Sequence, residues 1–449
     1  MSLWIKQVGG FFLSLLFTGQ IYAAGFALIE HSASGMGTAF ASGGAGAEDA
    51  STLFFNPASM ASFNKSQFSV AGHLIHPVGE FSNSSSVAAT GGDLSGANGD
   101  AGIDALVPNV YWFMPIGQKV HLGMAINVPF GLTTNYNDNW IGRYHGVKSE
   151  MSTININPAL SYKLNSQWSL GAGFNVQRAE VSLTSAVDFG AVCVGAVGSA
   201  DTCSNNYELE PQQDDGFAEI SGDSLAYGWN IGAMFQPLEA TRIGVSYRST
   251  MSHTVDGTAV FTVPSNATVL TLNGLFLDSN AQASVELPAS AQISASHEIV
   301  GGFTLMADVS WTGWSSFDEL RVEYDSAQPD SVTTENWKDS WRVAVGGRWQ
   351  QNNKLQLRGG VALDQSPVPD DQHRTPRVPG NDRLWLAAGL AYQLSSSLRF
   401  DVAYAHLFIP EGKIDNTFES ESVPTVRHTL SGSYESSVDI ASIQMTWTY

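Results

Sequence analysis

The feature that most constrains this chain is a strict alternation of apolar and polar side chains, seen most clearly in its last nine residues, "ASIQMTWTY". In an extended strand, alternate residues point to opposite faces, so Ala441, Ile443, Met445, Trp447 and Tyr449 share one apolar face. The same pattern recurs in "LRFDVAYAHLF", "WRVAVGGRWQ" and "KLQLRGGVAL". The chain is therefore predicted to consist mainly of β-strands with one apolar face.

The apolar face could contact lipid or form the core of a soluble β-sandwich. Aromatic residues cluster at strand ends, as they do at the two interfaces of a membrane, and the polar faces carry small and charged residues that suit a lumen. A mean hydropathy of -0.04 does not contradict a membrane location, because alternating strands average to a low value. The alternation favours a transmembrane β-barrel.

The connections between the strands support the same fold. Short breaks such as "PIGQ" and "LNSQ" alternate with long polar stretches such as "NSSSVAATGGDLSGANGD", as expected for short periplasmic turns and long outer loops. We predict an all-β, fourteen-stranded antiparallel barrel over residues 66–449, with strands near 66–76, 106–115, 118–130, 151–164, 167–182, 225–237, 241–255, 283–297, 301–315, 338–350, 354–363, 383–394, 397–408 and 436–449.

The N-terminus has the pattern of an export signal. Lys6 precedes the apolar run "VGGFFLSLLFTG", and "IYA" ends in the small residue Ala23. The run is shorter than the roughly 20 residues that a spanning helix needs. Residues 1–23 are therefore predicted to be a signal peptide, and the protein is expected in the outer membrane of a Gram-negative bacterium.

Charge and cysteine content exclude several functions. A formal net charge of -21 argues against nucleic acid as a partner. Cys193 and Cys203 are expected to form one local disulfide in an oxidising compartment, because a metal site would need two further ligands. No metal and no cofactor is expected.

About 40 residues separate the predicted cleavage site from the first strand. Residues 24–65 contain many apolar side chains, whereas disordered tails contain few aromatics. A barrel of this size leaves a lumen that its own side chains do not fill. We therefore predict that this segment, the hatch, plugs the lumen. Pro158 and the pair Pro129 and Gly131 are expected to mark bulges or local openings in the wall, because proline cannot donate a ladder hydrogen bond.

Several stretches resemble the FadL family of outer-membrane transporters for long-chain fatty acids and other hydrophobic compounds. They are "AGFALIEHSASGMGTAFA", "AEDASTLFFNPASM", "GRYHGVKSEMSTININPALSYKLN" and "TPRVPGNDRLWLAAGLAYQLSSSLRFDVAYAHLF". The resemblance implies a fourteen-stranded barrel that the hatch blocks, and a kink in the third strand that opens the wall sideways. It makes Asn56, Pro57 and Ala58 a hatch corner, and it makes Pro129 and Gly131 candidates for the kink.

The resemblance also implies a fatty acid as the ligand. Phe26 is expected to touch it, and outer-membrane lipid and lipopolysaccharide would surround a protein that is expected to be monomeric. A carboxylate head group needs a cation. Arg143 in an outer loop is one candidate, and alternation places seven arginines on the lumen face: Arg242, Arg248, Arg342, Arg348, Arg358, Arg383 and Arg399. The alternative is that these arginines pair with acids such as Asp308 and Asp401 and only brace the lumen.

Three other functions stay open on the sequence alone. The same architecture could take up aromatic or aliphatic hydrocarbons. A lipid hydrolase would need serine and histidine, with His31, His73, His76, His121 and His406 as possible bases, but no G-x-S-x-G motif is present. A nonspecific porin would lack the hatch. The protein is therefore expected to be a transporter and not an enzyme.

Overall fold

The computed structural model describes residues 25–419 and 426–449, so the predicted signal peptide lies outside the described residues. The strands are β1 Gln67–Asn83, β2 Ala105–Ile116, β3 Val120–Asn127, β4 Gly131–Asn135, β5 Lys148–Lys163, β6 Trp168–Asp188, β7 Asp215–Leu238, β8 Thr241–Arg248, β9 Met251–Thr262, β10 Ser279–Leu287, β11 Ser290–Ile299, β12 Phe303–Thr312, β13 Glu319–Tyr324, β14 Ser331–Thr334, β15 Ser340–Gln350, β16 Leu355–Asp364, β17 Arg383–Gln393, β18 Leu398–Glu419 and β19 Arg427–Thr448. The helical segments are α2 Ala33–Met36, α3 Thr52–Phe55, η1 Pro57–Ser62, α4 Phe189–Val197, α5 Ala200–Tyr207, η2 Ser265–Thr271 and η3 Trp314–Ser316.

These strands close into one antiparallel barrel, because β1 pairs with β2 on one side and with β19 on the other. Five wall strands are interrupted and appear as two segments each: β3 with β4, β8 with β9, β10 with β11, β12 with β13, and β14 with β15. The 19 segments therefore make fourteen wall strands, 19 minus five. The predicted fold class and strand number are confirmed.

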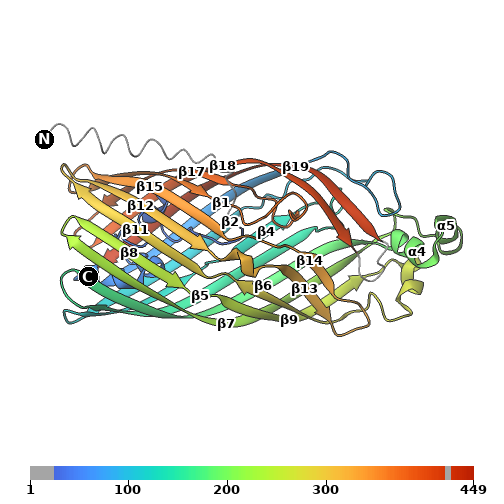
Figure 1. The fold of residues 1–449 in the computed structure, drawn as a ribbon, viewed down its shortest axis with the longest axis horizontal. Coiled ribbons are helices and arrows are strands. Elements are labelled where there is room, and N and C mark those ends of the chain that lie inside the picture. The colour runs from blue at the N-terminus through green and yellow to red at the C-terminus, as the bar shows by residue number, and fades with distance from the viewer. Residues whose placement is uncertain (1–24, 420–425) are drawn as a thin grey trace.

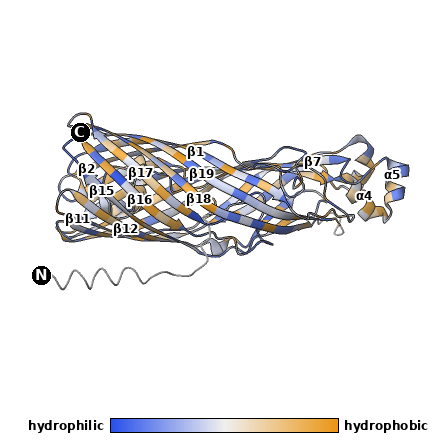
Figure 2. Ribbon diagram, turned by 90° about the horizontal axis from the view of Figure 1, so that it is seen from above, coloured by the Kyte–Doolittle hydropathy of each residue, from blue (hydrophilic) through white to orange (hydrophobic). Residues whose placement is uncertain are grey.

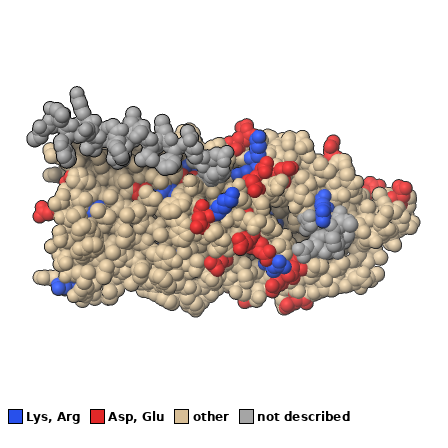
Figure 3. Space-filling model, in the orientation of Figure 1, with Lys and Arg blue, Asp and Glu red and all other residues tan. Residues whose placement is uncertain are grey.

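The two ends of the barrel differ as the loop lengths predict. Tight turns and the C-terminus lie at one end, and α4 and α5 project from the other (Figure 1). On the tight-turn half, apolar and polar residues alternate along each strand (Figure 2), and charged side chains gather instead toward the half that carries α4 and α5 (Figure 3). The half with few exposed charges carries outward apolar side chains such as Leu170, Ile231 and Ile443, and it provides the band that lipid requires. No helix in the described part of the chain is long and apolar enough to cross a membrane.

The hatch lies inside the barrel, between its walls. The helix α2 contacts β17, β18 and β19, while η1 contacts β3, β5, β6 and β7. Phe40, Leu53 and Met60 of the hatch are fully buried. Their burial shows that the hatch is packed as a core rather than extended as a tail.

Glycines in the wall make this close packing feasible. A Cβ atom at Gly232 would lie 2.0 Å from the Asn56 side-chain oxygen, and one at Gly171 would lie 2.3 Å from the Ala58 nitrogen. On the opposite wall, a Cβ at Gly360 would lie 2.2 Å from the Thr38 backbone. The wall lacks side chains where the hatch backbone approaches it.

The third wall strand is kinked between β3 and β4. Asn127 pairs with Asn155, and Gly131 pairs with Ser152, so three residues, 128–130, lie opposite two on β5. The start of the hatch fills this interruption, since the Leu28 N–H donates to the Pro129 carbonyl (2.9 Å). The expected distortion around Pro129 and Gly131 is therefore present.

The expectation of a bulge or opening at Pro158 is wrong. Ile156 pairs with Val176 and Ala159 pairs with Gly173, so the register is the same on both sides of the proline. The Asn157 side chain donates to the Phe174 carbonyl (2.8 Å) and supplies the hydrogen bond that proline cannot make. The wall stays closed there.

Candidate functional site

The inner cavity lies between the hatch and the wall. It measures about 150 Å³ and reaches from the kink to the opposite wall. Its lining is mostly apolar, and it contains hatch residues Leu28, Phe54 and Phe55 and kink residues Pro129 and Phe130. Polar groups also line it, among them three arginines, the acids Glu30 and Asp364, and several serine and amide side chains.

Phe26 is buried beside this cavity in a cluster of aromatic rings. Its ring centre lies 4.7 Å from that of Trp314, 5.6 Å from Trp337, 5.9 Å from Phe317 and 6.3 Å from Phe130. Trp314 and Phe130 line the inner cavity, whereas Phe26 packs against these two rings and does not line the cavity itself. The cluster fixes the start of the hatch against the wall.

Three of the predicted lumen arginines hold the hatch. Glu48 of the hatch lies 3.0 Å from Arg348 and 2.7 Å from Arg358, and Arg358 also pairs with Asp401 (2.6 Å). Arg399 pairs with Asp401 (2.9 Å) and with Asp49 of the hatch (2.7 Å). These arginines have the bracing role that was the alternative to ligand binding.

Two further candidates lie away from the inner cavity. Arg143 is buried in the outer loops, where it pairs with Asp215 (2.7 Å) and donates to the Tyr144 hydroxyl (2.7 Å). Arg242 does not line the inner cavity. Arg143 is therefore separate from the other candidates, whereas Arg242 lies near Arg348 and Glu48 in the group of charges that holds the hatch.

Arg248, Arg342 and Arg383 line the inner cavity. Arg342 donates to the Ala39 carbonyl (2.8 Å), and both Arg342 and Arg383 stand opposite Asp364 in the strand ladder. These two arginines therefore share Asp364 as a neighbour, and Glu30 also lies near both.

Arg248 has a different environment. It donates to the Asn175 side-chain oxygen (2.7 Å) and to the Phe54 carbonyl (2.9 Å), and its guanidinium lies 4.3 Å from the centre of the Phe54 ring. Among the described residues it has no acidic partner within 4.0 Å. It is a partly buried cation with free capacity for an anion.

The predicted hatch corner is rigid. The Asn56 side chain accepts a hydrogen bond from the Ala58 N–H (3.0 Å) and donates to the carbonyls of Gly44 (2.9 Å) and Ala233 (3.1 Å). Pro57 begins η1, where its fixed φ suits the first turn. One amide thus joins two parts of the hatch and the barrel wall.

Sequence reasoning missed a row of buried amides on the lumen side of β3, β5, β6 and β7. Its members are Asn127, Asn155, Asn157, Asn175 and Asn230. Their side chains are hydrogen-bonded to one another over 3.0–3.1 Å. Asn155 and Asn157 in "TININPAL" are two residues apart, so the alternation rule assigns them to the lumen face and gives a signal for part of the row.

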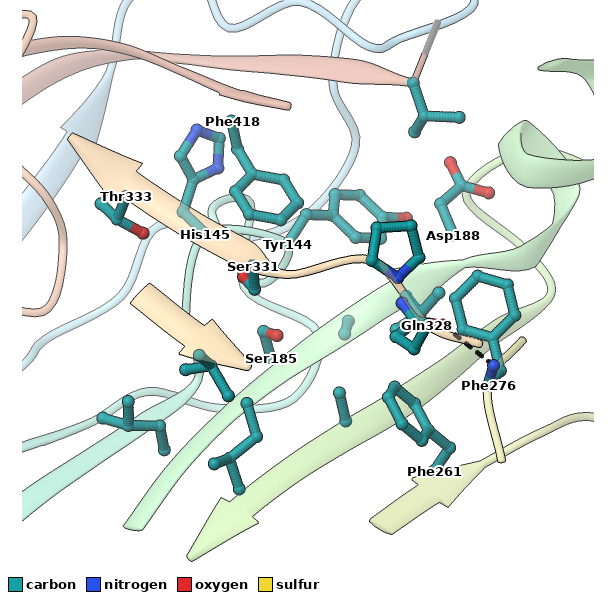
Figure 4. A pocket seen from close by; sticks show the side chains of 18 of the residues that line it. Tyr144, His145, Ser185, Asp188, Phe261, Phe276, Gln328, Ser331, Thr333 and Phe418 are labelled. Atoms are coloured by element: carbon teal, nitrogen blue, oxygen red, sulfur yellow. Dashed lines mark hydrogen bonds between the residues drawn. The ribbon is translucent and has the colours of Figure 1, made fainter. Parts of the chain in front are cut away.

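The outer cavity is about 110 Å³ in volume and lies among the outer extensions of the strands. Phe261, Phe276 and Phe418 supply aromatic rings, and the Phe276 N–H donates to the Gln328 side chain (3.0 Å; Figure 4). Burial raises the pKa of Asp188 to about 6 and lowers the pKa of His145 to about 4. At pH 7 the cavity therefore presents apolar surface, a neutral His145 imidazole and a mostly ionised Asp188 carboxylate.

Two chemical features of the loops complete the description. Cys193 and Cys203 form a disulfide that joins α4 to α5, with an S–S distance of 2.06 Å. In the described part of the chain, no three or more His, Cys, Asp or Glu side chains are grouped so that they could hold a metal ion.

The closed barrel, its internal hatch and the apolar cavity beside a gap in the wall define an outer-membrane protein with a plugged, laterally interrupted lumen. The chain belongs to the family described as "Outer membrane protein transport protein (OMPP1/FadL/TodX)", which it matches over residues 14–449. The resemblance inferred from the sequence motifs is thereby confirmed.

Individual relatives agree with this assignment. The chain is 30% identical over 426 residues to a "Long-chain fatty acid transport protein" of Escherichia coli, covering 90% of this chain and 93% of that protein. The crystal structure of a Pseudomonas aeruginosa FadL homologue superposes with a TM-score of 0.84 at 24% identity, covering 94% of this chain and 99% of the other. The P. putida toluene transporter TodX gives a TM-score of 0.62 at 15% identity over 89% of this chain and 94% of the other.

Proposed function

We propose that this protein takes up long-chain fatty acids across the outer membrane, with Arg248 binding the carboxylate. The observation that carries the proposal is a partly buried arginine that lines the inner cavity and has no acidic partner within 4.0 Å among the described residues. Leaving a buried cation unpaired is costly, so an anionic ligand would stabilise this site. The fatty-acid transporter of E. coli is a relative whose described substrate has this chemistry.

The proposed route begins at the outer cavity, whose aromatic lining captures the acyl chain. Each methylene that leaves water contributes about 0.8 kcal/mol, so long chains bind best. The ligand then enters the inner cavity and leaves sideways through the interruption at residues 128–130, once residues 26–28 withdraw from it. Apolar cavity lining at Pro129 and Phe130 supports this exit.

Uptake of hydrocarbons is the second candidate function. The inner cavity has aromatic lining at Phe54, Phe130 and Trp314, and the fold is shared with a toluene transporter. A hydrocarbon has no carboxylate, so it would form neither an ion pair nor a hydrogen bond with Arg248. The two functions therefore differ in their dependence on this side chain.

The same proposal covers the oligomeric state of the protein, the lipid around it and the processing of its N-terminus. The protein works as a monomer surrounded by outer-membrane lipid and lipopolysaccharide, since the closed sheet leaves no strand edge to pair with another copy. Residues 1–23 are removed as a signal peptide, which intact mass of the mature protein would test.

The substrate leaves chemically unchanged. His73 does lie 2.7 Å from the Ser442 hydroxyl, but this pair lines neither the inner nor the outer cavity. Ester turnover by the purified protein in detergent would contradict this part of the proposal.

The test is ligand binding to the purified protein, with Arg248→Gln compared to wild type. Hydrogen bonds to charged groups contribute about 1.5–3 kcal/mol, so the variant should bind a long-chain fatty acid at least about tenfold more weakly. Toluene binding should stay unchanged. Arg178→Gln is the matched control, because Arg178 is 56% exposed and pairs with acids outside the cavity. Equal fatty-acid affinity in wild type and Arg248→Gln would favour the hydrocarbon function.

A further inference from the structure

The hydrogen bonds of the amide row fix which end of each side chain is oxygen and which is nitrogen. One Asn157 atom contacts the Phe174 carbonyl (2.8 Å), so it must be the nitrogen, and the Asn230 atom 3.0 Å from it must be an oxygen. Arg248 can only donate, so the Asn175 atom 2.7 Å from it is an oxygen, and the Asn175 nitrogen faces Asn230 (3.0 Å). Two independent anchors thus give Asn230 the same orientation.

This orientation leaves one donor unused. The Asn230 oxygen receives two hydrogen bonds from the β5 and β6 side, while its Nδ2 has no hydrogen-bond partner among the described residues. Asn230 is only 2% exposed, lines the inner cavity and stands opposite Arg248 in the β7–β8 ladder. A buried donor without a partner costs about 1–3 kcal/mol, so its retention needs an explanation.

We propose that Asn230 and Arg248 together form a two-point carboxylate site in the inner cavity. The guanidinium binds one oxygen of the ligand and the Asn230 amide donates to the other. This inference rests on the proposed function and adds a second ligand-binding residue to it. Two converging donors select an anion with two acceptor oxygens, which a hydrocarbon or an ester does not offer equally well.

A glycine makes the orientation of Asn230 feasible. Asn157 on β5 reaches Asn230 on β7 across Gly173 of β6, and a Cβ at Gly173 would lie 2.5 Å from the Asn230 oxygen and 2.6 Å from the Asn157 nitrogen. Any larger residue would break this bond. Gly173 and Asn157 are therefore positioning residues for the carboxylate site, without contact to the ligand.

The experiment measures the affinity of a long-chain fatty acid relative to its methyl ester, using purified protein and displacement of a fluorescent acyl probe. Asn230→Ala should lower the preference for the acid about tenfold and leave ester affinity within about twofold. Asn230→Asp should abolish the preference, because the new carboxylate would pair with Arg248. Gly173→Ala should lower the preference severalfold. Arg178→Gln, a change at an exposed residue outside the cavity, should change nothing.

Ester binding serves as the folding check, and if Asn230→Ala loses it, the near-isosteric Asn230→Leu, which has neither a donor nor a charge, decides. A preference that is unchanged in the folded Asn230 variant, yet lost in Arg248→Gln, would overturn the two-point site alone. Absence of any acid preference in wild type would instead overturn the proposed function. Loss of the preference for the acid in both the folded Asn230 variant and Arg248→Gln supports the inference.

Discussion

At the scale of single residues, the position of the hatch depends on wall glycines, which leave room for its backbone, as well as on side chains that bind it. Gly232 leaves room for Asn56, and a Cβ there would lie 2.0 Å from the Asn56 oxygen and 3.3 Å from Pro57. We expect Gly232→Ala to displace the hatch corner at a cost of about 1–3 kcal/mol, as overpacking usually does. Ion conductance of the protein in planar bilayers should rise as the plug loosens.

Gly72→Ala is the matched control for this change, because a Cβ at Gly72 meets no atom within 4 Å. Its conductance should equal that of wild type. A Gly232→Ala protein with the same ion conductance as wild type would mean that the Asn56 corner does not keep the lumen closed.

At the scale of elements, one side chain of the neighbouring strand binds both backbone groups of Phe130 in the interruption between β3 and β4. The Thr153 hydroxyl accepts a hydrogen bond from the Phe130 N–H (3.0 Å) and donates to the Phe130 carbonyl (2.6 Å). Thr153→Val leaves both backbone groups without this partner at a cost of about 1–3 kcal/mol. Hydrogen exchange at the Phe130 amide should accelerate by about tenfold or more, whereas strand amides of β16 should not change. Unaltered exchange at Phe130 would show that another group satisfies it.

The sequence predicts the strands well where lipid contacts them and poorly beyond the membrane. β7 begins at Asp215 and β18 extends to Glu419, whereas alternation predicts only 225–237 and 397–408. Outside lipid both faces of a strand can be polar, so the alternation disappears while the ladder continues. The interruptions at 249–250, 288–289, 313–318 and 335–339 were likewise not predicted, although Pro288 gives a local signal for the second of them.

The same limit applies to the candidate site. Alternation correctly assigns Arg248 and Arg358 to the lumen. Only the fold shows that Glu48, more than 300 residues away in the sequence, pairs with Arg358 and that Arg248 has no such acid. Partner choice of this kind depends on contacts between distant parts of the chain. The corner at Asn56 and the distortion at Pro129 were predictable because backbone constraints of proline and side-chain capping by asparagine act locally.

At the scale of the whole molecule, hatch and barrel are joined by charges whose burial makes them sensitive to pH. Burial alone would raise the pKa of Glu48, but Arg358 and Arg348 outweigh it and lower this pKa to about 2. A carboxyl with a lowered pKa in the folded state stabilises fully above its ordinary pKa of 4.5 and loses its contribution as the pH falls through about 2. The plug of the wild-type protein should therefore stay closed at pH 5 and loosen only in stronger acid.

Glu48→Gln should reproduce the acid state at pH 7. Removing one partner of a buried ion pair costs about 3–5 kcal/mol, because Arg348 would lose its acid and Arg358 would keep only Asp401. We expect a raised bilayer conductance at pH 7 that changes little on acidification. Glu150→Gln is the control, since Glu150 is 48% exposed and pairs with Lys148 at the surface. A Glu48→Gln protein as tightly closed as wild type would assign closure to apolar packing of the hatch and not to its ion pairs.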